Sequence, residues 1–324
     1  MNKQNQILTV VLVVQLALAT AIFWPRAVAS GAESGPLLAN FKAAEVVGLS
    51  ISDADGNQVT LTKSGDTWVL PQADDFPADG TRITPLLDKI EAIKTNRLVT
   101  RTEASQKRLK VADGDFNRRL ELTLSDGSSH TLYLGSSAGA SATHVRADTA
   151  SEVFLTGDLT AFDANAQASA WIDTLFFSLP VTATVSLTLA NQNGTFEFEQ
   201  QGETWTMKGL AGDETLKEGE VTRLVDLAGA VRMTEPIGKV EQPDFGLAEP
   251  LATVTLKTAD KTYVLKVGAK DEQDSSYVMS SSESPYFVRV AQFTGDSFVT
   301  PTRDSFLEPP PTAEPEGAGG SSGS

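Results

Sequence analysis

Residues 64–70 read SGDTWVL, and residues 201–207 of the same chain read QGETWTM. Trp68 and Trp205 occupy the same position in the two stretches, and Gly65 matches Gly202. An internal match of this kind is the sequence signature of a repeated structural unit. A large aromatic side chain conserved between the two copies is expected to anchor each core, rather than to bind a ligand in one of them.

The residues before each tryptophan stretch also correspond. Residues 49–63, LSISDADGNQVTLTK, and residues 187–200, LTLANQNGTFEFEQ, both alternate apolar and polar side chains around an Asx-Gly pair. Alternation on both sides of such a pair is typical of a β-hairpin. We therefore expect a hairpin followed by a third strand that carries the tryptophan.

A helical pattern follows in each copy, with five apolar positions at the same spacing. These are Ile83, Leu86, Leu87, Ile90 and Ile93 in the first copy and Val221, Leu224, Val225, Ala228 and Val231 in the second. The spacing predicts one amphipathic helix in each copy. Pro85 is expected in the first turn of its helix, where a missing N–H costs nothing.

The second half of each copy returns to a β pattern. Residues 122–135 correspond to 254–268, and residues 144–155 correspond to 277–288. Antiparallel strands with one helix on a face predict the α+β class. The sequence therefore predicts two tandem homologous α+β repeats, in residues 43–179 and 182–308. The stretch from 309 to 324 is rich in Pro, Gly and Ser and is expected to be a disordered tail.

The N-terminal segment, residues 1–30, contains an uncharged stretch from 7 to 24. As a helix this stretch would be about 27 Å long, close to the hydrocarbon thickness of a bilayer. We expect a single-pass membrane anchor with the body of the protein on the extracytoplasmic side. A cleaved signal peptide is the alternative, because AVAS at 27–30 offers a cleavage site after Ala29.

A family resemblance is carried by the second copy. FGLAEPLATVTLKT at 245–258, followed by YVLKVGAKDEQDSSYVMSSSESPYFVRV at 263–290, resembles the bacterial membrane-anchored family called domain of unknown function 4340. The first copy departs from this pattern, with FNRRLELTL at 116–124. The resemblance implies an association with ABC-type export systems of the gliding-motility kind, and it implies no catalytic residues.

The residues offer little evidence for catalysis or metal binding. The chain has no cysteine and only two histidines, His130 and His144. Residues 135–139, GSSAG, match the nucleophile motif around Ser137, but the pattern of strands on both sides predicts a hairpin loop there. Residues 52–57, SDADGN, predict an Asx turn rather than a calcium loop, which would need a longer segment. We expect no enzymatic activity, no cofactor, no metal site and no small-molecule substrate.

One difference between the copies points to a binding surface. The chain has a formal net charge of −16, which disfavours binding to nucleic acid. Within the first copy, however, basic residues gather; the candidate docking residues are Arg97, Arg101, Lys107, Arg108, Lys110, Arg118 and Arg119. They form either a solvated helix end and loop, or a docking surface for an acidic partner or anionic lipid headgroups.

Together these patterns predict a non-enzymatic accessory or structural subunit of a membrane complex. The expected partners are the membrane protein subunits of an ABC-type export system. The alternative is a module that binds an envelope polymer or a lipid.

Overall fold

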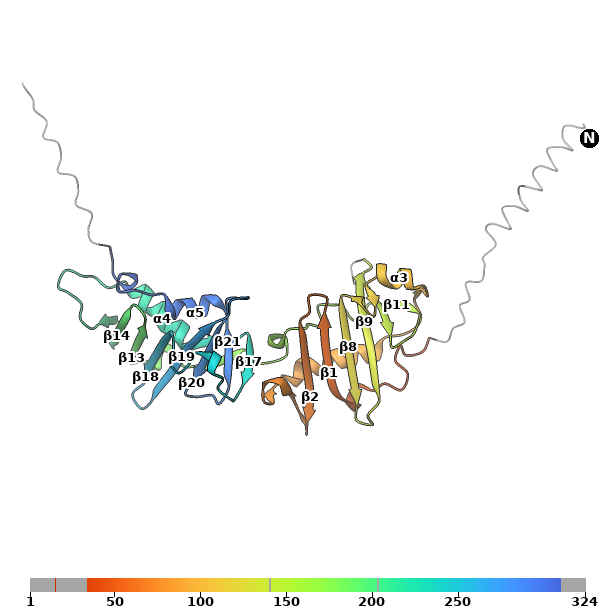
Figure 1. Ribbon diagram of the computed structural model, residues 1–324, viewed down its shortest axis with the longest axis horizontal. Coiled ribbons are helices and arrows are strands. Elements are labelled where there is room, and N and C mark those ends of the chain that lie inside the picture. Colours follow the sequence, from red (N-terminus) through yellow and green to blue (C-terminus); the bar gives the residue numbers. More distant parts are fainter. Residues whose placement is uncertain (1–14, 16–33, 140, 203, 310–324) are drawn as a thin grey trace, which may run out of the picture.

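The computed structural model describes residue 15 and residues 34–139, 141–202 and 204–309. Two units lie side by side along the longest axis of the molecule (Figure 1). The described part of the chain is built mainly from two antiparallel sheets, one of nine strands and one of eight. Both sheets lie within the ranges 43–179 and 182–308 predicted for the two repeats.

The first unit contains one large sheet, a two-stranded sheet and two α-helices. Its elements are η1 (Ala43–Glu45), β1 (Val46–Asp53), β2 (Gln58–Ser64), β3 (Thr67–Leu70), η2 (Pro71–Ala73), β4 (Phe76–Pro77), α2 (Gly80–Ala92), β5 (Leu98–Thr100), α3 (Glu103–Arg108), β6 (Val111–Ala112), β7 (Asp115–Phe116), β8 (Arg118–Leu124), β9 (Ser129–Ser137), β10 (Thr143–Ala147), β11 (Val153–Thr156) and η3 (Ala168–Ala170). The large sheet has the order β4-β3-β2-β1-β8-β9-β10-β11-β5.

The second unit contains an eight-stranded sheet, a two-stranded sheet and two α-helices. Its elements are β12 (Leu175–Ser178), η4 (Val181–Ala183), β13 (Ser186–Asn191), β14 (Gly194–Gln201), β15 (Thr204–Met207), α4 (Glu218–Gly229), β16 (Ala230–Arg232), β17 (Glu235–Gly238), η5 (Pro243–Phe245), β18 (Ala252–Lys257), β19 (Thr262–Lys270), β20 (Tyr277–Ser281), β21 (Phe287–Val290), α5 (Gln292–Val299) and η6 (Arg303–Phe306). The order β15-β14-β13-β18-β19-β20-β21-β17 repeats that of the first sheet from β3 to β5. This agreement in topology is what the internal sequence match predicts.

The hairpins lie where the alternating patterns placed them. β1 pairs with β2, and β13 pairs with β14. In the first turn the Asp53 carboxylate accepts hydrogen bonds from the backbone N–H groups of Asp55 and Asn57, at 3.0 and 2.9 Å. In the second turn Asn191 accepts from the N–H of Asn193 at 2.8 Å. Side chains of this kind close Asx turns, and the hairpin geometry follows from them.

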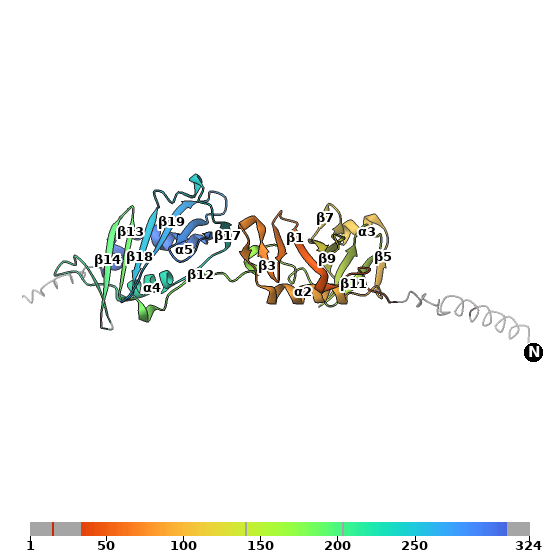
Figure 2. The ribbon, with the colours of Figure 1, turned by 90° about the horizontal axis from the view of Figure 1, so that it is seen from below.

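The two predicted helices are present and bury the predicted faces. In α2 the buried residues are Ile83, Leu86, Leu87 and Ile90, and in α4 they include Val221, Leu224, Val225 and Ala228. Figure 2 shows α2 and α4 along the same side of the two sheets. The expected position of Pro85 was wrong: α2 begins at Gly80, so the proline lies inside the helix rather than in its first turn.

The predicted α+β class is wrong, because the described residues are mainly β. The helix patterns were read correctly, but strands β4, β5 and β17 are too short to show alternation and were missed. The prediction also assigned one helix to each unit, whereas α3 and α5 add a second. Short strands therefore extend the first sheet at both edges, by β4 and β5, and the second sheet at one edge, by β17, beyond the part that the sequence pattern predicts.

The expected single-pass membrane helix is also corrected. Within the described residues, no helix is both long and apolar enough to cross a membrane. The segment from 7 to 24 that led to this prediction lies outside the described residues, apart from Gln15. The predicted tail from 309 to 324 lies outside them as well, apart from Pro309.

Each sheet has one face on which α2 or α4 lies and an opposite face. A short stretch of chain, here called the crossing segment, runs across this opposite face. In the first unit this segment contains α3, β6 and β7, and Val111, Tyr133 and Val153 form a small separate core beneath it. A Cβ atom added to Gly135 would lie 2.0 Å from the carbonyl oxygen of Leu109. In the second unit the crossing segment contains η5, and a Cβ on Gly268, which matches Gly135, would lie 2.0 Å from the carbonyl oxygen of Phe245. Because glycine has no Cβ atom, it allows the backbone of the crossing segment to lie this close to the strand below it.

Candidate functional site

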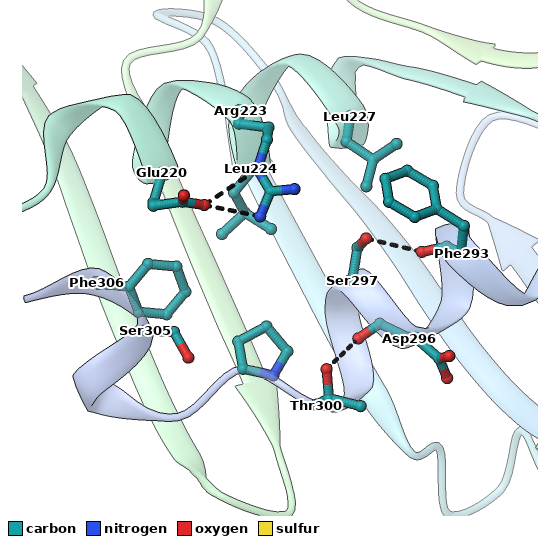
Figure 3. Close-up of a pocket in the computed structure, with 11 residues that line it drawn as sticks. Glu220, Arg223, Leu224, Leu227, Phe293, Asp296, Ser297, Thr300, Ser305 and Phe306 are labelled. Atoms are coloured by element: carbon teal, nitrogen blue, oxygen red, sulfur yellow. Dashed lines mark hydrogen bonds and ion pairs between the residues drawn. The ribbon is translucent and has the colours of Figure 1, made fainter.

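A groove crosses the second unit between α4, α5 and η6 (Figure 3). It encloses about 400 Å³, and its apolar lining includes Leu224, Leu227 and Phe306. Phe293 lies beside Leu227, and 65% of its surface is exposed. A large aromatic side chain exposed at an apolar groove is a feature of binding surfaces rather than of a monomer core.

The wall formed by α5 is held firmly against the sheet. The Tyr277 hydroxyl donates to Asp296 Oδ1 at 2.5 Å, and Lys270 Nζ lies 3.4 Å from the same oxygen. The hydrogen bond from Tyr277 is the larger of these two influences, and with the lysine it holds the pKa of Asp296 below its usual range. The tyrosine ring packs directly on Gly295, where an added Cβ would lie 2.0 Å from the ring. The groove is therefore largely preformed on this side.

The polar groups at the rim are already engaged with each other. Arg223 donates to Glu220 Oε2 from Nε at 3.0 Å and from Nη2 at 2.7 Å. The hydroxyls of Ser297 and Thr300 donate to the carbonyl oxygens of Phe293 and Asp296, both at 2.7 Å. These bonds leave the apolar floor as the main free surface, so the groove suits apolar side chains better than an ionic ligand.

Within the described residues, the first unit has no α-helix at the position that corresponds to α5. The loop after β11 is tied to α2 by an ion pair between Lys89 Nζ and Asp163 Oδ1, at 2.5 Å. Trp171, which is buried, donates from Nε1 to the carbonyl oxygen of Asn165 at 2.8 Å. The groove is thus a difference between the two copies. Sequence reasoning missed it because residues 291–299, AQFTGDSFV, show no clear helical stripe.

Arg97 and Arg101, the first two predicted docking residues, flank the edge strand β5. Both are exposed. Arg101 Nε pairs with Glu152 Oε1 at 3.1 Å, and the carbonyl oxygen of Arg97 accepts from the N–H of Leu155 at 3.0 Å. The guanidinium of Arg97 has no ion-pair partner within the described residues.

Lys107, Arg108 and Lys110 lie at the C-terminal end of α3 and just beyond it. Lys107 and Arg108 are exposed, and neither forms an ion pair in the described part of the chain. Lys110 Nζ pairs with Asp115 Oδ1 at 2.7 Å. Cations at this end of a helix also interact favourably with the helix dipole, so part of their role is local.

Arg118 and Arg119 do not belong to the same surface, because consecutive residues of a strand point to opposite faces of the sheet. Arg118 donates from Nε to the carbonyl oxygen of Ala164 at 2.9 Å and from Nη1 to that of Asn117 at 2.7 Å. Arg119 pairs with Glu121. Both side chains are half-buried. They serve the fold of the first unit, and only the other five predicted residues lie together near β5 and α3.

Arg146, which sequence reasoning did not select, is the buried cation of this region. Its side chain stacks over the Tyr133 ring at 4.2 Å and donates from Nε to the carbonyl oxygen of Val111 at 2.6 Å. Its Nη2 pairs with Asp113. The hydrogen bond from Arg146 holds the pKa of Asp113 below its usual range. Arg146 thereby fastens the β6–β7 segment to the sheet.

Within the described residues, the Ser137 hydroxyl forms no hydrogen bond with His130 or His144. Ser137 ends β9, which pairs with β10, so the predicted hairpin loop is confirmed. The Ser137 hydroxyl donates to the carbonyl oxygen of Gly139 at 3.0 Å. His144 Nδ1 lies 2.7 Å from the carbonyl oxygen of Ser136 and 3.2 Å from its hydroxyl. Because a nitrogen bonded to a carbonyl oxygen carries the proton, Nδ1 is the donor in this contact, and Nε2 is the nitrogen that can accept a proton.

Acidic side chains are likewise engaged in local structure. The predicted Asx turn at Asp53 is confirmed by its hydrogen bonds. In the loop after β19, Asp271 pairs with Arg289 at 3.1 Å. Among the described residues, no group of three His, Asp or Glu side chains is arranged to hold a metal ion. His130 Nδ1 lies 3.1 Å from Asp148 Oδ2 on the sheet surface.

The fold and the groove define a mainly β protein of two homologous units with a candidate protein-binding surface on the second. The chain belongs to the family described as Domain of unknown function (DUF4340), whose model matches residues 68–233. The match begins at Trp68 in the first unit and ends in the second, so it includes both tryptophan strands and both α2 and α4. No curated protein and no solved structure is significantly similar to the chain.

Proposed function

We propose that the chain is a non-enzymatic accessory subunit that binds another protein through the groove between α4, α5 and η6. The observation that carries this proposal is Phe293, which is 65% exposed beside an apolar floor. Grooves between helices accept the apolar face of an amphipathic helix, and exposed aromatic residues supply much of the binding energy in such contacts. The occupant is accordingly a helix with apolar side chains on one face.

The expected partner is a subunit of an ABC-type export system. This part of the proposal rests on the family resemblance, not on the geometry. The non-enzymatic part is supported by Ser137, whose hydroxyl donates to the carbonyl oxygen of Gly139. It is also supported by the rim of the groove, where Ser297 and Thr300 are bonded to backbone oxygens.

A module that binds an envelope polymer or a lipid is the second candidate. The observation in its favour is the exposed pair Lys107 and Arg108, which have no ion-pair partner within the described residues. This candidate places binding on the first unit and predicts that an isolated anionic polymer or anionic vesicle binds without any second protein. Changes in the groove of the second unit should not affect that binding.

The test combines a groove variant with a matched control. Phe293→Asp places a charge at the groove, whereas Phe162→Asp places the same charge on a phenylalanine of the first unit that is 89% exposed. A photo-crosslinking residue at Ser297, combined with mass spectrometry of the complex isolated in mild detergent, identifies the contact. We expect a defined crosslinked subunit that Phe293→Asp removes and Phe162→Asp retains. Loss of about 2 kcal/mol of binding corresponds to roughly thirtyfold weaker association.

Two results would contradict the proposal. One is an absence of crosslinks from Ser297 while crosslinks from the first unit are strong. The other is an equal loss of the partner with both aspartate variants, which would indicate a general effect of charge. A clean monomer in mild detergent after crosslinking would argue against any accessory role.

A further inference from the structure

β5 forms the outer edge of the first sheet and exposes apolar side chains there. It is the last strand in the sheet order, and Leu98 and Val99 are 43% and 42% exposed. The carbonyl oxygen of Arg97 accepts from the N–H of Leu155 on the neighbouring strand, at 3.0 Å. Because backbone groups alternate sides along a strand, the N–H and C=O of Leu98 point away from the sheet. This edge can therefore accept one more strand.

A small pocket lies next to this edge. It encloses about 250 Å³ and is lined by apolar side chains that include Leu37, Leu98 and Phe154. When an extended segment joins a sheet edge, its backbone supplies the hydrogen bonds and pockets of this kind receive alternate side chains. The pocket thus gives the edge a means to select an apolar residue.

The charge around the edge is strongly basic in an otherwise acidic chain. Lys94, Arg97, Lys107 and Arg108 are exposed, and none has an ion-pair partner in the described part of the chain. The chain as a whole has a net charge of −16. Pairing of this edge with the same edge of a second copy would bring like charges together, which is unfavourable. A segment of opposite charge meets no such repulsion.

At the corresponding edge of the second unit, an acidic side chain binds to the backbone next to the outermost strand. There β17 is the outermost strand, and Lys239 directly follows it at the position that matches Arg101. The Asp74 carboxylate of the first unit accepts from the backbone N–H of Lys239 at 2.6 Å. The matching edge in the first unit, β5, is free of any such contact within the described residues.

We propose that β5 is a strand-addition site for an extended acidic segment of a partner protein, with an apolar residue of that segment in the pocket beside Leu98. The site lies on the first unit and does not depend on the groove of the second. If no partner bound the groove, the proposal for β5 would still stand. If no peptide bound β5, the proposal for the groove would still stand.

The test uses the full chain and short fluorescent peptides capped at both ends. In the first peptide glutamate alternates with valine, in the second lysine replaces glutamate, and in the third alternate backbone nitrogens of the glutamate peptide are methylated. We expect the glutamate peptide to bind, the lysine peptide to bind at least roughly tenfold more weakly at low salt, and the methylated peptide to lose binding. Fluorescence anisotropy measures all three.

Variants of the chain locate the contact. Leu98→Pro removes an outward N–H without disturbing the bond from Leu155, so it should abolish binding, whereas Leu98→Ala keeps the donor and should weaken binding only several-fold. Arg97→Glu should weaken the glutamate peptide and favour the lysine peptide. Equal binding of the methylated peptide, or no binding of the glutamate peptide, would overturn the proposal. So would binding to phosphatidylserine vesicles with no affinity for any peptide.

Discussion

The Asp74 carboxylate accepts a hydrogen bond from the backbone N–H of Lys239 at 2.6 Å and so joins the first unit to the second. The neighbouring residues strengthen this junction. The Tyr286 hydroxyl donates to the carbonyl oxygen of Asp75 at 3.3 Å, and the rings of Phe76 and Tyr286 lie 4.8 Å apart. Residues 74–76 of the first unit therefore contact the second unit through a carboxylate, a backbone oxygen and an aromatic ring.

The contribution of this hydrogen bond can be isolated by comparing two neighbouring substitutions. Asp74→Ala removes the carboxylate that accepts from Lys239. Asp75→Ala keeps the contact of Asp75 with the second unit, because Tyr286 donates to the backbone oxygen of Asp75 and not to its side chain. Both residues have positive φ, 53° and 59°, so both substitutions carry a similar backbone cost. With about 1 kcal/mol for the hydrogen bond, we expect the Lys239 amide to exchange roughly fivefold faster in Asp74→Ala than in Asp75→Ala. Equal exchange rates in the two variants would show that Asp74 does not hold the junction.

The two strand glycines under the crossing segments should be intolerant of any side chain. Gly135→Ala and Gly268→Ala each place a Cβ 2.0 Å from a backbone oxygen, so the crossing segment must move. We expect each substitution to lower the free energy of unfolding by about 3 kcal/mol, measured by urea denaturation. Gly114→Ala is the control, because its Cβ would meet nothing within 4 Å. A loss in the two strand variants no larger than in this control would mean that the segments are not packed as described.

Much of the fold could be predicted from the sequence, because long elements leave strong patterns. Alternation over β1 and β2, and the helical spacing in α2, each extend over enough residues to be recognised. The repeat itself was readable from Trp68 and Trp205. The short edge strands were not, since two to four residues carry no period, and they form only when a neighbouring strand supplies their hydrogen bonds.

The candidate site was much less predictable. A count of basic residues located the surface near β5 and α3, but it also included Arg118 and Arg119, whose partners are backbone oxygens and a nearby glutamate. Charge patterns do not show which face of a strand a residue occupies. The groove depends on α5, which Gly295 and the Tyr277–Asp296 pair hold in place through contacts between distant segments. Such tertiary contacts have no local sequence signature.

The paired tryptophans should be equivalent anchors of the two cores. Trp68 and Trp205 are 7% and 6% exposed. Truncation of a buried tryptophan leaves a cavity, so Trp68→Ala and Trp205→Ala should each cost about 3–5 kcal/mol in the unfolding of their own unit. Phe162→Ala, at an aromatic residue that is 89% exposed, should change stability by less than about 0.5 kcal/mol. If either tryptophan variant behaved like this control, that residue would not be a core anchor.

The stability of the second unit should depend on pH through Asp296. The hydrogen bond from Tyr277, together with Lys270, lowers the pKa of Asp296 in the folded protein. A carboxyl group of this kind stabilises the fold above its unfolded pKa of about 3.9, and this contribution is lost as the pH falls through the lower folded value. We therefore expect the urea concentration at the unfolding midpoint of the second unit to decrease when the pH is lowered below about 4. Asp296→Asn should make this decrease smaller. Asp226→Asn, on the exposed side of α4, is the control and should leave it unchanged. If the urea midpoint depended on pH identically in the two variants, protonation of Asp296 would not be linked to stability. The contact between Tyr277 and Asp296 would then not hold α5, which forms the wall of the groove, in a pH-dependent way.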